Sequence, residues 1–109
     1  MTILNQTGEA FVGADVEFTF TLTTGDATTM TLEADLTHVW GGSRFARYTE
    51  GNGITVDDTD TVRVEIPATD SVRLSAQQEY RLALWDTASG SVAPLGIATI
   101  LMRDGGRKP

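Results

Sequence analysis

Hydrophobic and polar residues alternate with a period of two along most of this chain. In "VEFTFTLT", residues 16–23, every second side chain is apolar and the others are glutamate or threonine. Such alternation is typical of a β-strand with one buried face. It recurs in "MTLEADLTHVW" (30–40), "TVRVEI" (61–66) and "EYRLALWDT" (79–87). The pattern predicts an all-β protein with one shared core that contains Phe18, Phe20, Leu32, Val64, Ile66, Leu82 and Leu84.

Shorter segments complete the predicted set of strands. "GITV" (53–56) is a short strand, and residues 44–48 are expected to pair briefly as an edge strand. The last strand, "APLGIATILM" (93–102), is apolar on both faces, which indicates a central position or a contact on each side. About seven strands separated by turns favour an immunoglobulin-like antiparallel β-sandwich, and a small barrel is the alternative. In "ATDSVRL" (68–74), Thr69 or Asp70 is suited to cap a single helical turn.

Length and composition indicate one globular domain. The 109 residues leave little room for two domains, and we assign 1–102 to a single domain and the polar, glycine-rich 103–109 to a flexible tail. The chain has no cysteine, which excludes disulfides and thiolate metal sites. "MTILNQTGEAF" lacks the charged and apolar regions of a signal peptide, and no segment has the ~20 apolar residues of a membrane span.

The charge balance bears on the class of partner. Eight basic residues stand against fifteen acidic ones, a formal net charge of -7. This sign, without a basic stripe, argues against a nucleic-acid partner. It suits solubility, or docking onto a basic surface.

Three aspartates, Asp57, Asp58 and Asp60, lie close together in "VDDTDTV". An EF-hand loop needs a central glycine and a distal glutamate at fixed offsets, and this segment fits that pattern poorly. The segment lies between two alternating runs, where aspartate and threonine commonly hold a hairpin turn through bonds to nearby amides. We therefore predict a turn with no metal, and a loose two-loop calcium site is the alternative.

Candidate catalytic residues are few. His38 is the only histidine, and the serines lack the context of a nucleophile elbow. "GGS" (41–43) has neither the lysine nor the following helix of a phosphate-binding loop. We expect no enzymatic activity and no cofactor.

Trp85 is the leading candidate for a partner-binding residue. It falls on the polar phase of its strand, on the same phase as Arg81, and tryptophan is enriched among interface anchors. The alternative is that a loop or the tail covers it. Trp40 ends a strand beside a Gly-Gly loop and is a further candidate, although core packing is the favoured role there. The predicted partner-binding residues are thus Trp85, Arg81 and Trp40.

Three segments together resemble a family of small phage domains: "GADVEFTFTLTTGDA", "GITVDDTDTVRVEIPATDSVRL" and "EYRLALWDTASGSVAPLGIATI". The family includes the N-terminal domain of siphophage baseplate upper proteins and small standalone virion proteins. The resemblance covers roughly Gly13 to Leu101, and the chain departs from the pattern at "TGDATTMTLEA". It implies a structural role and no catalytic residues.

The resemblance implies a non-enzymatic virion protein, made in the host bacterial cytoplasm, that docks onto capsid, tail or baseplate subunits. Self-association into a homo-oligomer stays open. A second class of function is a carbohydrate-binding module for a host surface glycan, with Trp85, Trp40 and Tyr48 as stacking candidates. Those three side chains would have to meet in one exposed groove.

Overall fold

The computed structural model describes residues 4–22, 25–39, 44–88 and 94–104. Within them the chain forms eight strands and two single helical turns. In chain order these are β1 (Leu4–Phe11), β2 (Val16–Thr21), η1 (Ala27–Thr29), β3 (Leu32–His38), β4 (Ala46–Glu50), β5 (Gly53–Val56), β6 (Thr61–Ile66), α1 (Ala68–Ser71), β7 (Glu79–Asp86) and β8 (Gly96–Arg103).

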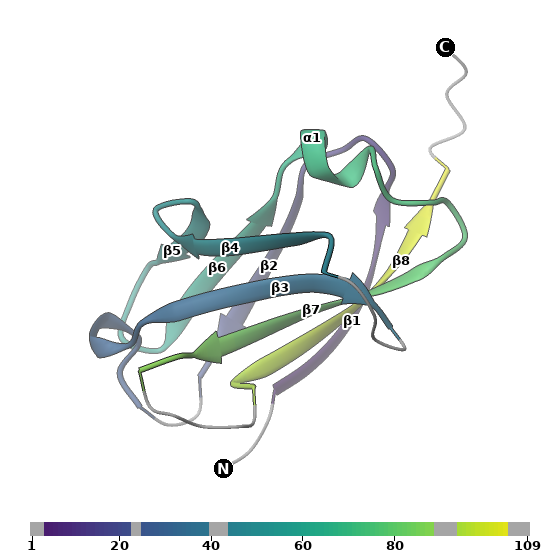
Figure 1. The fold of residues 1–109 in the computed structure, drawn as a ribbon. Coiled ribbons are helices and arrows are strands. Elements are labelled where there is room, and N and C mark those ends of the chain that lie inside the picture. The colour runs from purple at the N-terminus through teal and green to yellow at the C-terminus, as the bar shows by residue number, and fades with distance from the viewer. Residues whose placement is uncertain (1–3, 23–24, 40–43, 89–93, 105–109) are drawn as a thin grey trace.

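All eight strands belong to one hydrogen-bonded sheet in the order β1-β8-β7-β3-β4-β5-β6-β2. Neighbours are antiparallel except β1 with β8 and β4 with β5, and the β4–β5 pairing has only two residue pairs. The sheet curls on itself, and the turn that joins its end strands β1 and β2 lies beside α1 (Figure 1). These end strands touch without pairing, so the sheet is nearly closed around the core.

The predicted core is confirmed at six of seven positions. These six side chains are at most 2% exposed: Phe20, Leu32, Val64, Ile66, Leu82 and Leu84. Phe18 points to the same side but is only half-buried. It lies at the unpaired junction of β1 and β2, where its ring comes within 3.2 Å of the position that a Cβ on Gly8 would occupy. The ring therefore closes the junction by side-chain contact rather than by hydrogen bonds.

Strand β1 is the element that the hydrophobic pattern does not predict. Its sequence, "LNQTGEAF", is largely polar and does not alternate. It pairs in parallel with β8 over eight positions, from Leu4 opposite Gly96 to Phe11 opposite Arg103. Backbone amides and carbonyls make this pairing, so it needs no particular side chains.

The single turn of α1 confirms the predicted helical turn, but the predicted cap is wrong. Thr69 and Asp70 lie inside the turn, and Pro67 occupies the N-cap position without a side-chain hydrogen bond. The free amide of Ala68 instead donates to Asp15 Oδ1 at 2.8 Å, from the turn between β1 and β2. A carboxylate brought near by the fold thus does what a local cap would otherwise do.

Ser71 makes a second link between α1 and the β1–β2 turn. Its hydroxyl is fully buried and donates to the carbonyl oxygen of Ala14 at 2.6 Å. A buried hydroxyl without such an acceptor would be costly, so the bond is part of how this end of the sheet is held.

The last strand runs slightly past the predicted domain boundary. β8 ends at Arg103, whose Nη2 donates to Glu9 Oε1 of β1 at 2.7 Å. This hydrogen bond, and then the positive charge of Arg103, lower the pKa of Glu9. Most of the predicted tail, residues 105–109, lies outside the described residues. No helix in the described part of the chain is long and apolar enough to cross a membrane.

Candidate functional site

Strands β7 and β8 turn one set of side chains to the core and the other outward. Cross-strand pairs on the outward side are Glu79 with Leu101, Arg81 with Thr99 and Ala83 with Ile97. Trp85 continues the same side along β7, opposite Glu33 of β3. We call this surface the β7–β8 outer face; it consists of Glu79, Arg81, Ala83, Trp85, Ile97, Thr99 and Leu101.

The β7–β8 outer face is unusually apolar for the outside of a sheet. Trp85, Ile97 and Leu101 are half-buried there. Ala83 is only 6% exposed although it faces outward, opposite Ile97 of β8. The sequence carries a signal for this face, since both phases of the last strand are apolar.

The structure brings two of the three predicted partner-binding residues to one surface. Trp85 and Arg81 lie on the same strand and the same face, with Ala83 between them. Trp85 is half-buried rather than fully exposed. Trp40 lies outside the described residues.

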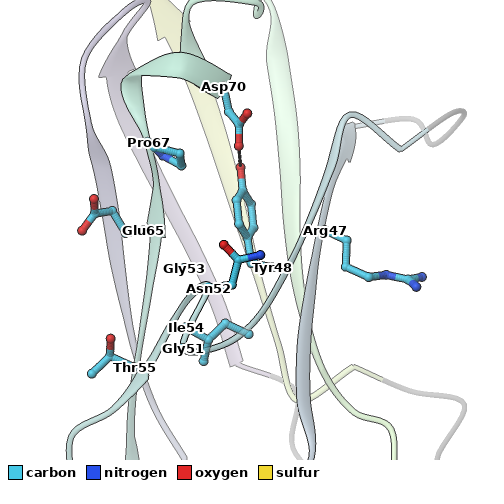
Figure 2. Close-up of a pocket in the computed structure, with 10 residues that line it drawn as sticks. All are labelled: Arg47, Tyr48, Gly51, Asn52, Gly53, Ile54, Thr55, Glu65, Pro67 and Asp70. Carbon is cyan, nitrogen blue, oxygen red and sulfur yellow. Dashed lines mark hydrogen bonds between the residues drawn. The ribbon is translucent and has the colours of Figure 1, made fainter.

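A hollow of about 420 Å³ lies where β4, β5 and β6 meet the segment that leads into α1 (Figure 2). Its polar lining includes Asn52, Glu65 and Asp70. Figure 2 shows that Glu65 and Arg47 point to opposite sides, and Arg47 is engaged by Asp35 of β3 at 3.2 Å. Its charged side chains therefore do not converge on one point, which is what a specific ligand site requires.

Tyr48 forms the inner wall of this hollow. Its hydroxyl donates to Asp70 Oδ2 at 2.8 Å, and the residue is 4% exposed. The ring lies against Gly53, which has a φ of 101° and where a Cβ would approach Tyr48 Cδ1 to 2.7 Å. Burial, and then the hydrogen bond to Asp70, raise the pKa of Tyr48 above its usual value.

The burial of Tyr48 overturns its predicted role in stacking on a carbohydrate. A stacking platform must present its ring to solvent, and this ring is covered. Tyr48 points into the core from β4, whereas Trp85 faces outward from β7, so the two cannot share a groove. The Tyr48–Asp70 pair had no local signal, because 22 residues separate its members.

The aspartate segment forms the predicted turn between β5 and β6. Asp57 binds both Nε and Nη2 of Arg63, at 2.9 and 3.1 Å. Asp58 Oδ1 accepts from the amide of Thr59 at 2.7 Å, and Asp60 Oδ1 accepts from the hydroxyl of Thr61 at 2.9 Å. Each carboxylate thus has its own partner within the hairpin, which accounts for the acidic residues as turn formers.

Excess calcium is expected to leave the melting temperature unchanged relative to chelator. The carboxylates of the turn are directed at Arg63, Thr59 and Thr61 rather than at one point. A ligand that bound only the native state would raise the melting temperature by mass action. A calcium-dependent rise of several degrees that an Asp57→Asn variant loses would establish a calcium site here.

His38 packs among aromatic rings at the end of β3. It stacks on Tyr80 with ring centroids 4.9 Å apart and meets Phe45 edge-on at 5.1 Å. Among the residues that the structure describes, no three His, Asp or Glu side chains are grouped so that they could hold a metal ion. This placement gives His38 a structural contact in the aromatic cluster.

Comparisons with known proteins concern the fold alone. No protein-family model matches the sequence, and no curated protein is significantly similar to it. Among solved structures, the chain is similar to one chain in a crystal structure of ICOS in complex with ICOS-L and an anti-ICOS-L VNAR domain. The TM-score is 0.51 and the sequence identity 8%, over 94% of this chain and 56% of the other. This chain therefore spans just over half the length of that chain.

Proposed function

We propose that this chain is a non-enzymatic structural protein of a phage virion, which docks onto capsid, tail or baseplate subunits through the β7–β8 outer face. The resemblance of three segments to small phage domains supports the virion assignment. It also supports production in the cytoplasm of a bacterial host. The apolar outer face supports docking as the mode of action.

The contrast between two outer surfaces of the same sheet carries the docking proposal. On β2 and β6 the outward side chains are polar, with Glu17 opposite Glu65 and Thr19 opposite Arg63. On β7 and β8 the equivalent positions include Trp85, Ile97 and Leu101. An antiparallel sheet with one solvated face normally shows the polar pattern. An apolar outer face therefore fits a surface that a partner covers.

We further propose that the sheet is divided into two packed layers, as in an immunoglobulin-like sandwich. One layer contains β1, β8, β7, β3 and β4, and the other contains β5, β6 and β2. The two-pair contact between β4 and β5 is a weak link between these layers. Tyr80, near the start of β7, also accepts a hydrogen bond from the amide of Ser75 at 2.8 Å. A tyrosine hydroxyl bonded to backbone a few residues upstream is a recurrent feature of such sandwiches.

Replacing Trp85 by alanine is expected to leave the domain folded but lower its affinity for virion particles about thirtyfold. Aromatic anchors at the centre of an interface typically contribute about 2 kcal/mol or more, which corresponds to this factor. The measurement is a titration of purified protein onto particles that lack it, with bound copies counted. Val72→Ala is the control, because Val72 is 59% exposed and follows α1, away from β7 and β8.

Three outcomes of this titration separate the alternatives. Loss of binding in Trp85→Ala but not in Val72→Ala supports the proposal. Equal binding by wild type and Trp85→Ala removes Trp85 as the anchor. Binding by wild type to a host glycan and to no virion component would assign the chain to the carbohydrate-binding class. Contacts between acidic rim residues and the partner should weaken with salt, whereas the apolar anchor should respond much less.

A further inference from the structure

Arg81 differs from the other arginines in the described part of the chain. Five of these six arginines have a carboxylate oxygen within 4.0 Å. The pairs are Arg44–Asp35 at 3.7 Å, Arg47–Asp35 at 3.2 Å, Arg63–Asp57 at 2.9 Å, Arg73–Asp70 at 3.8 Å and Arg103–Glu9 at 2.7 Å. Arg81 has no such partner among the described residues.

Arg81 is half-buried, and a half-buried guanidinium without a carboxylate partner among the described residues is unusual. Its side chain is half-buried on the β7–β8 outer face, between Thr37 of β3 and Thr99 of β8. Its Nε is buried and has no hydrogen-bond partner among the described residues. Buried polar groups are hydrogen-bonded in the great majority of cases. The terminal Nη nitrogens are the part of the guanidinium that a docked molecule can reach.

We propose that Arg81 receives a carboxylate from the docked partner, an aspartate or glutamate side chain flanked by apolar residues. The inference rests on the proposed function, because it takes the β7–β8 outer face as the docking surface. A guanidinium binds a carboxylate through two parallel hydrogen bonds, and the pair is strengthened where water is excluded. Apolar residues on the partner would cover Ile97, Leu101 and Trp85 and so exclude water from the ion pair.

The charges around Arg81 favour a single carboxylate over a polyanion. Glu79 lies two residues away on the same face, and Glu9 lies beside Leu101 across β8. The whole chain has a formal net charge of -7. A nucleic acid or an anionic membrane would meet this repulsion over its whole length, whereas one carboxylate held at Arg81 meets much less of it. The partner is therefore acidic at this point, although the net charge alone would favour a basic one.

The first test compares arginine variants in the titration onto particles that lack the protein. Arg81→Met keeps an unbranched apolar stem and removes the cation, and we expect affinity to fall about thirtyfold or more. Arg81→Lys keeps the positive charge but cannot form two parallel hydrogen bonds to one carboxylate. We expect a smaller loss of affinity, about tenfold. Arg63→Met is the matched control, because Arg63 lies on the polar β2–β6 side and pairs with Asp57. Its affinity should stay within about twofold of wild type.

The second test identifies the anion on the particle. Particles are treated with a carbodiimide and glycinamide, which convert exposed carboxylates to neutral amides and leave phosphodiesters unchanged. Wild-type binding should fall, and the difference between wild type and Arg81→Met should disappear. A difference that persists after the treatment would overturn the carboxylate as the ligand of Arg81.

The outcomes distinguish this inference from the proposed function. If wild type binds, Trp85→Ala binds weakly and Arg81→Met binds like wild type, the docking face stands and the carboxylate inference fails. If wild type does not bind particles at all, the proposed function fails, and the inference fails with it. Melting temperatures of the Arg81 variants near that of wild type would show that the losses are not caused by unfolding.

Discussion

Replacing Phe20 by alanine is expected to lower the free energy of unfolding by about 3–5 kcal/mol. The Phe20 ring is 0% exposed and lies on β2 opposite Val62 of β6. Its removal takes a large apolar group from the core and leaves a cavity that the sheet can fill only in part. Typical domains have only about 5–15 kcal/mol in total, so the variant should melt well below the wild type. Urea denaturation with thermal melts measures the change.

Two other phenylalanines provide matched controls for this experiment. Phe18 is half-buried at the junction of β1 and β2, so Phe18→Ala should cost less than Phe20→Ala. Phe11 is 54% exposed, so Phe11→Ala should change stability by about 0.5 kcal/mol or less. The expected order of loss is Phe20, then Phe18, then Phe11. An unchanged melting temperature in Phe20→Ala would contradict the placement of this ring in the core.

Raising the pH above about 10 is expected to destabilise the protein through Tyr48. The pKa of the Tyr48 phenol is raised by burial and then by the hydrogen bond to Asp70. Above the ordinary tyrosine pKa of about 10, the unfolded chain has lost this proton and the folded chain keeps it. The unfolded state then binds fewer protons, so the free energy of unfolding falls with pH, by about 1.4 kcal/mol per unit. Below about pH 10 the contribution of this group to stability is fully present.

The Tyr48→Phe variant isolates this effect. Urea denaturation at several values between pH 8 and about pH 11 should show a shallower decline in the variant, because it has no phenol at position 48. Tyr80 is present in both proteins and cancels in the comparison. At neutral pH the variant should be about 1 kcal/mol less stable, since Asp70 loses a hydrogen bond. Parallel declines in the two proteins would exclude Tyr48 as the source of alkaline sensitivity.

Much of the fold could be predicted because the alternation along a strand is local. Phe20, Leu82 and Leu84 fall on every second position of their strands, and each is buried as predicted. The turn at residues 57–60 was also predictable, because its aspartates bond to groups within a few residues. The apolar outward phase of β8 gave a partial signal for the β7–β8 outer face.

The place of β1 and several long-range hydrogen bonds could not be predicted from the local sequence pattern. β1 is polar, and its place in the sheet depends on pairing with β8 at the far end of the chain. Asp15 accepts a hydrogen bond from the first amide of α1, although the two residues are 53 positions apart in the sequence. Asp70 accepts a hydrogen bond from Tyr48 and does not cap the turn. Each of these bonds depends on which residue the fold brings near, which the local pattern does not specify.

The candidates Trp85 and Arg81 also combine one feature that the sequence predicts with one that only the fold decides. That Trp85 and Arg81 lie on one face follows from the sequence, because their spacing of four keeps the same side of any strand. That Arg81 alone among the described arginines lacks a carboxylate does not follow from it. The face of a strand to which a residue belongs is set by the backbone geometry of that strand. The partner that a charged side chain finds is set by the distances between strands far apart in the chain, which exist only after the sheet has formed.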